Sequence, residues 1–379
     1  MSNDVNEIVG NGPFENQLSQ YCASLEDVEA AYERINGIAH KTPVLTCSSI
    51  SDMISSGDKT SKANCFFKVE ALQKTGSFKF RGALNAIQSL ISEQHHQTHC
   101  EGKAKDLNVV THSSGNHAQA LALAAKLAST KLFNVNATIV MPDNAPSIKK
   151  RAVEGYGAEV VLVQSTNEAR EAKANEIVKQ RGSYFIHPSE DPRVIAGQGT
   201  VCLEFVSQVQ SMTGGESLDI VIIPVGGGGL ASGCTTSLRG LLKSKVKIVL
   251  AEPLEMDDAK RSFESGKLLG HYVDNKLNSI ADGLKTTLGP NTWPIIRDMV
   301  SDVMTVSEKE ILMATKLIWE RLKICIEPSA GVGVAVAMSD TFKRKFLNVE
   351  QSRDVKNIGI VLCGGNVDVI KIATLMKDL

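Results

Sequence analysis

Short apolar runs alternate with longer amphipathic runs along most of the chain from about residue 105 onward. The apolar runs, which are rich in β-branched residues, span 108–112, 137–142, 159–163, 184–188, 219–225, 246–253 and 358–365. Apolar strands that are buried on both faces and separated by helices are typical of parallel α/β sheets. Because one chain carries so many of these strands, the pattern predicts two parallel sheets, each in its own α/β domain.

Composition and charge narrow the function. The chain has 379 residues and a formal net charge of -1 without a long basic run, so it lacks the positive surface of a nucleic-acid-binding protein. Residues 1–21 are polar and contain no Lys or Arg, which predicts an extension rather than a targeting peptide. No apolar run reaches the roughly 20 residues of a membrane-spanning helix, and the eight cysteines form no CxxC pair. We expect a cytoplasmic protein with reduced thiols and no membrane partner.

The turns after the strands are where chemistry is expected, because ligands of α/β sheets collect at the carboxyl ends of strands. The segment "PVGGGGLASG" places Gly226 to Gly229 between a strand and a helix. Their backbone N–H groups can converge on a phosphate at the helix N-terminus. The segment lacks the Lys-Ser/Thr of a P-loop and the dinucleotide fingerprint, which disfavours NAD or a nucleoside triphosphate at this turn. A glycine-rich turn without a ligand is the alternative.

A second turn, "THSSGNHAQA" at residues 111–120, has the same position between a strand and a helix. It is expected to present Ser114, Asn116 and His117 at an exposed tip, where hydroxyl and amide groups can bind a carboxylate or a ring oxygen. The alternative is that Ser113 or Ser114 caps the helix that follows.

A lysine lies between two phenylalanines in "KTGSFKFRGA", residues 74–83. In a partly apolar pocket the pKa of a lysine falls, and the free amine becomes a nucleophile toward an aldehyde. Lys79 is therefore a candidate for the covalent attachment of an aldehyde cofactor. The alternative is a lysine that extends from a helix start into solvent.

This lysine, the two turns and a late "LCGGN" together resemble the fold type II pyridoxal-phosphate enzymes, in the group of the serine racemases and the serine/threonine dehydratases. The resemblance extends from about Leu25 to the C-terminus and includes "VIAGQGT", "ADGLK", "NTWPIIRD", "WERLK", "IEPSAGVGVA" and "GGNVD". It implies an α/β fold of the tryptophan synthase β type, with pyridoxal 5'-phosphate in the cleft between two open parallel-sheet domains. A small mobile domain at 108–190 is then inserted in a large domain formed by 22–107 and 191–379, and the chain forms a homodimer.

The resemblance also implies the residues of the site. Lys79 holds the cofactor covalently, and Lys79 and Ser114 exchange protons with opposite faces of the substrate. The implied cofactor contacts are Phe78, Lys79, Asn116, Ser189, Gly226, Gly227, Gly228, Gly229 and Cys363. The implied substrate contacts are Ser113, Ser114, His117, Arg170 and Thr286. For Arg170, a solvated charge on a helix surface is the alternative.

Two bases on opposite faces permit racemisation, whereas loss of a β-hydroxyl from the same carbanionic state gives elimination. The resemblance therefore implies a racemase that interconverts L- and D-serine and also converts serine to pyruvate and ammonia. The alternatives within the family are a dehydratase (ammonia-lyase) of serine, threonine or threo-3-hydroxyaspartate, and an aspartate racemase. A protein that only stores the aldehyde is a further alternative, against which the intact pair of Lys79 and Ser114 argues. A dinucleotide oxidoreductase lacks its fingerprint spacing.

Relatives in this group bind a divalent cation and, between subunits, ATP as an activator. The matching cation ligands are the carboxylates of Glu252 and Asp258 and the backbone carbonyl of Met256, hard oxygen donors that suit Mg²⁺, Ca²⁺ or Mn²⁺. The alternative is an acidic helix start stabilised by the helix dipole. The positions that match the ATP site are Ser48, Ser49, Ile50, Lys74, Thr75, Gln119, Tyr156, Lys323 and Asn366.

Two positions depart from the relatives. Ser189 stands where serine racemases typically carry an asparagine, and Cys363 stands near the pyridine nitrogen where close relatives have serine. For Cys363, plain packing of a buried thiol is the alternative.

One cluster of potential metal ligands lies outside the resemblance, in "EQHHQTHCEGK". Clustered histidine and cysteine side chains can bind a soft or borderline metal, although the polar surroundings favour a solvated loop. Its members are His95, His96, His99 and Cys100.

Overall fold

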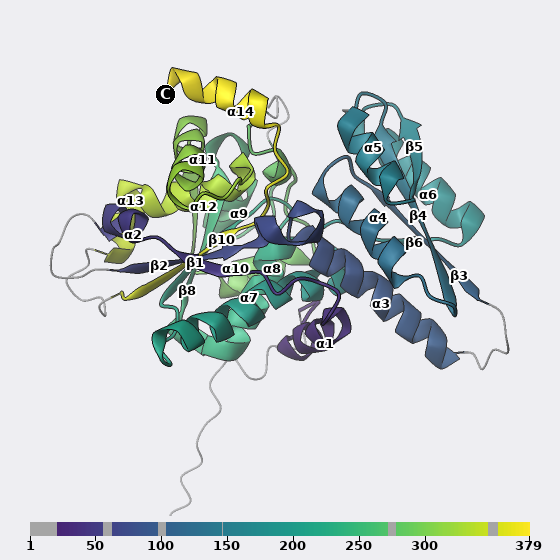
Figure 1. Cartoon of the computed structure of the whole chain (residues 1–379), viewed down its shortest axis with the longest axis horizontal. Helices are drawn as coiled ribbons and strands as arrows, with labels where there is room; N and C mark the ends of the chain where they lie inside the picture. The colour runs from purple at the N-terminus through teal and green to yellow at the C-terminus, as the bar shows by residue number, and fades with distance from the viewer. Residues whose placement is uncertain (1–20, 56–62, 98–103, 146, 272–277, 348–354) are drawn as a thin grey trace, which may run out of the picture.

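The computed structural model describes residues 21–55, 63–97, 104–145, 147–271, 278–347 and 355–379. It contains two sheets that lie in separate halves of the molecule (Figure 1). The two predicted sheets are thus confirmed. The predicted extension at 1–21 lies, apart from Tyr21, outside the described residues.

The larger sheet has six strands in the order β1-β2-β10-β7-β8-β9. These strands are β1 Val44–Thr46, β2 Asn64–Val69, β7 Ile220–Pro224, β8 Lys247–Pro253, β9 Asp302–Val306 and β10 Asn357–Leu362. Neighbouring strands are parallel except β1, which pairs antiparallel with β2 at the edge. Strands β1 and β2 precede the predicted alternation, and β2 is placed by pairing with β10 from the far end of the chain.

The smaller sheet has four parallel strands in the order β5-β4-β3-β6. These strands are β3 Lys105–His112, β4 Phe133–Pro142, β5 Glu159–Val163 and β6 Tyr184–Phe185. Because all four are parallel, their carboxyl ends meet at one edge of the sheet. The turn after β3 and the segment after β6 therefore lie near each other.

Helices cover the sheets and connect them. The helices are α1 Leu25–Ile35, α2 Ser48–Ser55, α3 Lys79–Gln97, α4 Asn116–Ala128, α5 Ser147–Gly155, α6 Asn167–Arg181, α7 Pro192–Thr213, α8 Gly229–Leu242, α9 Asp258–Ser265, α10 Thr292–Met299, α11 Glu308–Arg321, α12 Pro328–Met338, α13 Asp340–Phe342 and α14 Val369–Leu375. In the described part of the chain, no helix is long and apolar enough to cross a membrane.

Local sequence signals set where several helices begin and end. Ser24 and Ser307 cap α1 and α11 through capping boxes, which satisfy N–H groups that the first helical turn leaves free. Asp191 caps α7, and Pro192 follows at the first helical position. Gly214, in the left-handed conformation, ends the same helix, because glycine adopts this conformation without steric cost.

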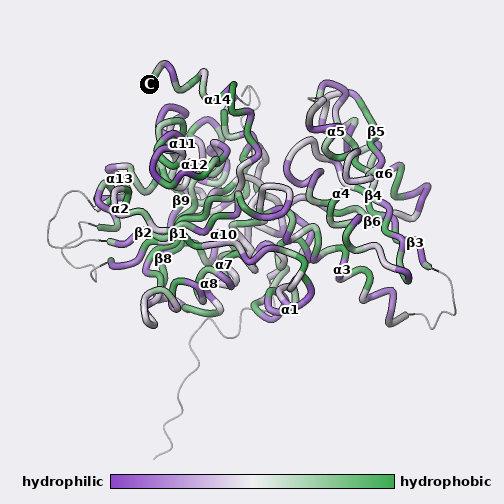
Figure 2. Tube along the Cα trace, in the orientation of Figure 1, coloured by the Kyte–Doolittle hydropathy of each residue, from purple (hydrophilic) through white to green (hydrophobic). Residues whose placement is uncertain are grey.

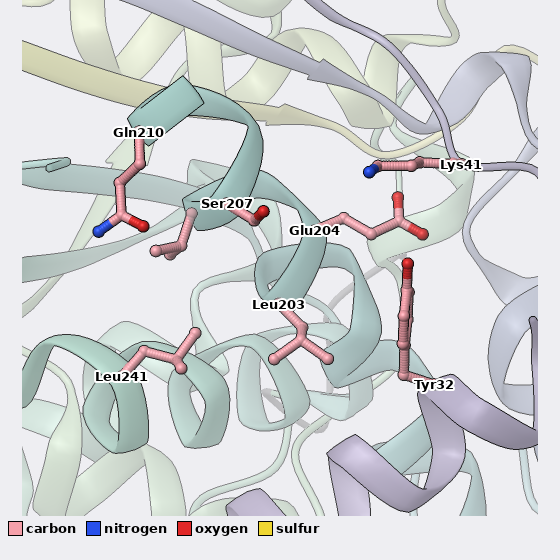
Figure 3. A pocket seen from close by; sticks show the side chains of 8 residues that line it. Tyr32, Lys41, Leu203, Glu204, Ser207, Gln210 and Leu241 are labelled. Atoms are coloured by element: carbon pink, nitrogen blue, oxygen red, sulfur yellow. The ribbon is translucent and has the colours of Figure 1, made fainter. Parts of the chain in front are cut away.

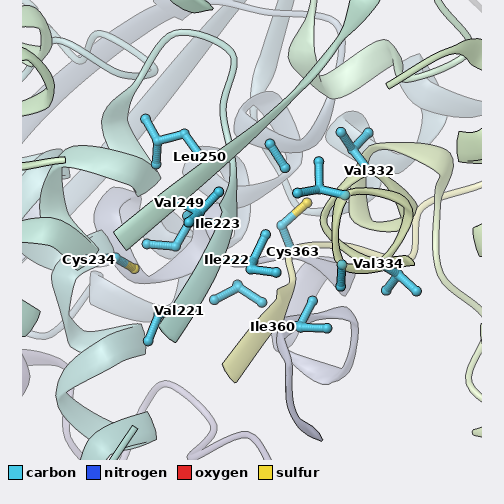
Figure 4. Close-up of a cluster of buried hydrophobic side chains, with 14 of the residues drawn as sticks. Val221, Ile222, Ile223, Cys234, Val249, Leu250, Val332, Val334, Ile360 and Cys363 are labelled. Atoms are coloured by element: carbon cyan, nitrogen blue, oxygen red, sulfur yellow. The ribbon is translucent and has the colours of Figure 1, made fainter. Parts of the chain in front are cut away.

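Strands β7, β8 and β10 form the core of the larger half with α12. Figure 4 shows Ile222 of β7 and Ile360 of β10 on one side of the helix that carries Val332 and Val334. A Cβ added to Gly333 would lie 3.4 Å from Ile360 and 3.6 Å from Ile222, so the helix packs closely on the sheet. Figure 2 shows the strands as the hydrophobic centre of this half. Each buried aliphatic side chain of this kind contributes roughly 1.5–3 kcal/mol to folding.

Helix α3 connects the two halves. It packs against α7 and against α4, and it runs between the two sheets in Figure 1. Its Phe80, Leu84 and Ile87 are buried in the core of the smaller half. That core therefore includes side chains from before residue 108, and the domain boundary at 108 stays a prediction.

Candidate active site

Lys79 is the first residue of α3. Its Nζ donates a hydrogen bond of 2.7 Å to the carbonyl oxygen of Pro188, in the segment after β6, and lies 5.2 Å from the centre of the Phe78 ring. Burial lowers the pKa of Lys79 to about 8, with a smaller opposing effect of Cys363. Phe80, the second phenylalanine, is fully buried in the core. The two aromatic rings thus anchor the helix start, while the amine contacts the segment after β6.

The turn between β3 and α4 follows the strand that pairs with β6, and the charge of Lys79 reaches His117 in α4. Gly115 is the N-cap of α4 and makes no side-chain capping bond, so the alternative of capping by Ser113 or Ser114 is wrong. The Ser113 hydroxyl instead accepts a hydrogen bond from the Gly115 N–H at 3.3 Å, which shapes the turn. Ser114 is half-buried. Part of Ser114 therefore remains accessible to solvent.

His117 differs from its predicted setting. The ring is 2% exposed and its Nε2 lies 3.2 Å from the carbonyl oxygen of Ile186, so the expectation of an exposed His117 is wrong. Burial first, and the nearby charge of Lys79 second, lower the pKa of His117 well below its ordinary value. The ring is neutral, and its Nδ1 has no hydrogen-bond partner among the described residues.

A buried glutamate that the sequence reasoning did not single out completes this side of the site. Asn116 donates to Glu327 at 2.9 Å, and Asn366 donates to the side-chain oxygen of Asn116 at 2.9 Å. Together they fix which way the Asn116 amide points and leave it one N–H for a further acceptor. Burial raises the pKa of Glu327 to about 7, although the bond from Asn116 opposes this. The available signal was an acid inside the apolar segment "CIEPSAGVGV".

Cys363 lies at the end of β10, behind Lys79. Its carbonyl oxygen accepts from the N–H of Phe78 at 3.1 Å, which links the helix start to the larger sheet. Burial first, and the charge of Glu327 second, raise the pKa of the Cys363 thiol well above its ordinary value. The thiol is therefore neutral.

The tetraglycine turn joins β7 to α8, as predicted. Gly228 has φ +83°, and a Cβ there would lie 2.7 Å from Thr292. A Cβ on Gly227 would lie 2.6 Å from the Ser189 hydroxyl oxygen and 3.1 Å from that of Thr286. The turn thus requires glycine, and it brings two of the predicted contacts, Ser189 and Thr286, to the start of α8.

Arg170 lies on α6, where its Nε donates to the Thr166 carbonyl oxygen at 3.2 Å. After burial, its charge is the next largest cause of the lowered pKa of His112, the last residue of β3. Arg170 therefore lies near the edge of the sheet that carries the serine turn. This position is compatible with both interpretations given for it.

The predicted cation ligands lie between β8, which contains Glu252, and the start of α9, whose first residue is Asp258. Glu252 accepts from the N–H groups of Ala259 and Lys260, each at 2.9 Å, so it also caps this helix as the alternative interpretation expects. Burial raises the pKa of Glu252 well above its ordinary value, with a contribution from the charge of Asp258, and raises the pKa of Asp258 to about 6. Two buried carboxylates side by side are an environment that a cation would stabilise.

Apart from these two carboxylates, few potential metal ligands of the described residues lie close together. Among the residues that the structure describes, no group of three or more His, Cys, Asp or Glu side chains is arranged to hold a metal ion. A cation at Glu252 and Asp258 would thus depend on the Met256 carbonyl and water. Of the predicted histidine and cysteine cluster, His95 is exposed at the end of α3, the side chain of His96 is not described, and His99 and Cys100 lie outside the described residues.

The positions matched to an ATP site come partly together. Asn366 donates to the Thr75 carbonyl oxygen at 2.6 Å, and α4, which carries Gln119, packs against the turn of Lys74 and Thr75. Ile50 is fully buried, so only its backbone could contact a nucleotide. The remaining positions are in α2 (Ser48, Ser49), after α5 (Tyr156) and after α11 (Lys323).

A separate cavity of about 270 Å³ lies between α1, α7 and α8 (Figure 3). Its lining includes Tyr32, Lys41, Glu204 and Leu241. None of the predicted site residues lines it, so it is distinct from the site built around Lys79.

Comparison with known proteins shows to which family the chain belongs. A family model for pyridoxal-phosphate dependent enzymes matches residues 35–364, and the chain belongs to this family. It is 45% identical to the serine racemase of Homo sapiens over 360 residues, 95% of this chain and 96% of that protein.

Solved structures agree. The fold is similar to that of the serine racemase from Dictyostelium discoideum, with a TM-score of 0.78 and 44% identity over 92% of this chain and 99% of that chain. It is also similar to a pyridoxal 5'-phosphate-dependent aspartate racemase (TM-score 0.79, 37% identity, 93% and 98%) and to the maize serine racemase (0.79, 38%, 94% and 98%). The expected fold type and family are confirmed, and the protein is a pyridoxal-phosphate-dependent enzyme.

The residues present fit this cofactor. A Cβ on Gly227 or Gly228 would collide with Ser189 or Thr292, so this turn needs glycine. It lies at the N-terminus of a helix, where backbone N–H groups favour a phosphate. Lys79, with its lowered pKa, would supply the amine that reacts with the aldehyde. The Asn116 amide, oriented by Glu327 and Asn366, would offer its remaining N–H to a ring oxygen.

Proposed function

We propose that this enzyme is a serine racemase that also eliminates serine to pyruvate and ammonia. The observation that carries the proposal is the buried amine of Lys79, bonded to Pro188 after β6 and with a pKa lowered to about 8, whose charge also affects His117 in the helix that follows the Ser114 turn. Similarity to serine racemases over nearly the whole chain supports the choice of substrate.

Lys79 and Ser114 are proposed as the two proton carriers. When bound, pyridoxal phosphate withdraws electrons from the Cα of an attached amino acid and makes its proton acidic. An amine with a pKa of about 8 is partly neutral near pH 7.5, so Lys79 can both accept and return a proton on one face. The Ser114 hydroxyl is proposed to do the same on the other face. Release of the β-hydroxyl before the proton returns gives elimination.

The remaining residues bind and orient. Gly226 to Gly229, with Ser189 and Thr286 beside them, are proposed to hold the phosphate end, and Phe78 to pack against the ring. Cys363, as a neutral thiol, is proposed to face the ring nitrogen without an ionic bond. The proposed substrate contacts are Ser113, Ser114, His117, Arg170 and Thr286, where the turn N–H groups and the arginine suit a carboxylate.

Mg²⁺ or a similar divalent cation is proposed at Glu252, Asp258 and the Met256 carbonyl. The support is the burial of both carboxylates, which raises the pKa of each, because a cation would compensate their charge. ATP is proposed as an activator at the positions around Asn366 and Thr75.

A homodimer is proposed as the assembly. Helix α14 leaves Val369 50% and Ile370 81% exposed, and exposed apolar side chains of this kind are typical of contact surfaces. We also place the enzyme in a reducing compartment such as the cytoplasm, because the described cysteines are free.

The proposal is tested by incubating the cofactor-loaded protein with L-serine, L-aspartate and L-threo-3-hydroxyaspartate separately, with Mg²⁺ and with or without ATP. Chiral chromatography measures the D-amino acid and a coupled assay measures the keto acid. D-serine together with pyruvate supports the proposal. Keto acid without any D-isomer indicates a dehydratase, and D-aspartate as the main product indicates an aspartate racemase.

A further inference from the structure

Arg81 is two residues after Lys79 and is among the largest fully buried side chains of the chain. Its guanidinium donates to both carboxylate oxygens of Glu70, from Nε and Nη2, each at 2.8 Å. It also donates to both oxygens of Glu204, from Nη1 at 2.8 Å and from Nη2 at 2.9 Å. One planar group is thus held by two carboxylates in paired, directional hydrogen bonds.

The two carboxylates belong to different parts of the fold. Glu70 directly follows β2 and Glu204 lies in the middle of α7, whereas Arg81 is in the first turn of α3. Lys68 of β2 donates to Glu204 at 2.6 Å and is itself fully buried. The cluster therefore fastens the start of α3 to the larger sheet and to α7 together.

The formal charges of the cluster balance. Arg81 and Lys68 carry two positive charges, and Glu70 and Glu204 carry two negative charges. Burial lowers the pKa of Lys79 and the charge of Cys363 opposes this, so the cluster is not a cause of the shift. Replacing a buried ion network by apolar side chains often leaves stability unchanged or higher, so added stability alone does not account for the cluster. Directional bonds define a position more narrowly than apolar packing does.

The geometry of a helix relates this cluster to the active site. Two residues along an α-helix correspond to about 200° of rotation and about 3 Å of rise. Lys79 bonds to Pro188 after β6, and Arg81 points to the other side of the same turn, toward Glu70 and Glu204. On the N-terminal side, the N–H of Phe78 is fixed to Cys363. The backbone of Lys79 is thus held from both sides, by β10 before it and by the cluster after it.

We propose that Arg81 is a positioning residue for Lys79: the paired bonds to Glu70 and Glu204 fix the first turn of α3 and so set where the Lys79 amine stands relative to the cofactor and the substrate Cα. This inference rests on the proposed role of Lys79. A displacement of about 1 Å at a reacting group can lower a rate about 100-fold. Loosening the cluster therefore affects attachment of the cofactor and proton transfer more than binding of the substrate.

Three variants test the inference. Arg81→Lys keeps the charge but cannot form the paired bonds. The double variant Arg81→Met with Glu70→Gln removes one charge of each sign and leaves the pair of Lys68 and Glu204 in place, which avoids an unpaired buried charge. Arg239→Lys is the matched control.

Arg239 is a suitable control because it is also an arginine that fastens a helix. Its Nε donates to the Met299 carbonyl oxygen at 2.8 Å and its Nη1 donates to that of Val246 at 2.7 Å. It lies at the end of α8, away from Lys79 along the chain and in the fold. Its replacement reports the effect of losing a structural arginine alone.

Thermal unfolding measures folding, and kcat and KM for L-serine measure turnover. Cofactor attachment is followed after apoprotein is mixed with pyridoxal phosphate, as the rate at which the absorption of lysine-bound cofactor appears. We expect both Arg81 variants to fold, to lose about 10- to 100-fold in attachment rate and kcat, and to change KM by less than about 3-fold. Arg239→Lys is expected to keep the attachment rate and kcat.

The inference is overturned if the double variant folds and attaches the cofactor at the unchanged rate. It is also overturned if Arg239→Lys, at the same loss of thermal stability as the Arg81 variants, shows the same loss in attachment rate and kcat. Failure of the proposed function gives a different result. An unchanged protein that attaches the cofactor but does not act on serine contradicts the substrate alone, and the attachment rates still decide the role of Arg81. Absence of attachment in the unchanged protein overturns both.

Discussion

The side-chain amide of Asn116 donates a 2.9 Å hydrogen bond to Glu327, a buried residue 211 positions later in the chain. The bond joins the first residue of α4, in the smaller half, to the residue before α12, in the larger half. Because the pKa of Glu327 is raised to about 7 by burial, the contact contains a carboxyl that gains or loses its proton near neutral pH. A titratable group therefore bridges the two halves of the site.

Glu327→Gln is expected to change how stability depends on pH. The ordinary pKa of the carboxyl is 4.5 and its folded value is about 7, so between these pH values the unfolded chain loses the proton while the native state keeps it. The free energy of unfolding of the unchanged protein therefore falls as pH rises through this window. The variant lacks this fall and is expected to gain up to about 3 kcal/mol relative to the unchanged protein between about pH 4.5 and 7.5.

Urea denaturation of the apoprotein at about pH 4.5, 6 and 7.5 measures this difference. The exposed Glu33, replaced by glutamine, is the control and is expected to show a nearly constant difference. Parallel pH curves for Glu327→Gln and the unchanged protein would contradict the raised pKa.

Ser114→Ala is expected to separate the two proposed activities. Removal of the second proton carrier lowers D-serine formation by about 100-fold or more, whereas elimination, which needs the proton transfer at Lys79, keeps most of its rate. Ser113→Ala is the control, because the Ser113 hydroxyl supports the turn through Gly115 and its loss affects both products alike. Chiral chromatography and a pyruvate assay on the same samples measure the ratio. An equal loss of both products in Ser114→Ala would argue for a purely structural serine.

Lys79→Ala is expected to remove both the absorption of lysine-bound cofactor and all turnover of serine. The amine at this position is the proposed nucleophile toward the aldehyde, and an alanine offers no replacement. Lys126→Ala, at the exposed end of α4, is expected to retain both. Turnover that survives in Lys79→Ala would exclude the proposed mechanism.

Gly228→Ala is expected to weaken cofactor binding by at least about 10-fold, because a Cβ at this position would lie 2.7 Å from Thr292 and displace the turn. Gly266→Ala is a close control, since Gly266 also has a positive φ, +68°, but no atom within 4 Å of an added Cβ. Gly266→Ala has the same backbone strain of roughly 1 kcal/mol but brings the added Cβ into contact with no other residue. Equilibrium titration of each apoprotein with pyridoxal phosphate, followed by fluorescence, gives the affinities. Equal affinity in the two variants would mean that strain, not the contact with Thr292, accounts for any loss.

Mg²⁺ is expected to raise the melting temperature of the unchanged protein. At a Mg²⁺ concentration of about 100 times the dissociation constant, binding stabilises the native state by about 2.7 kcal/mol. Glu252→Gln and Asp258→Asn are expected to lose this shift. Glu255→Gln is the control, because Glu255 is an exposed acid of the same segment and its replacement leaves the shift intact. Thermal unfolding with EDTA and then with added Mg²⁺ measures it, and an unchanged shift in Glu252→Gln would place the cation elsewhere.

Much of the fold and of the candidate site could be predicted locally. Strands buried on both faces need apolar runs, and the turn after β7 needs glycine, so both are visible in the sequence. Lys79 between Phe78 and Phe80 was likewise readable, because an amine flanked by aromatic rings at a helix start indicates burial. The family resemblance then connected these segments with a cofactor.

Contacts between distant segments were decided only by the tertiary structure. Strand β2 is fixed by its pairing with β10, and the polar His117 is buried under Ile186 rather than exposed. Glu327 gained its raised pKa because residues far apart in the chain remove it from water. Local sequence determines propensity and chemical type, whereas burial and the approach of charges depend on long-range packing. The sequence therefore predicted Lys79 as the reactive amine, but only the fold showed the buried Glu70, Arg81 and Glu204 network beside it.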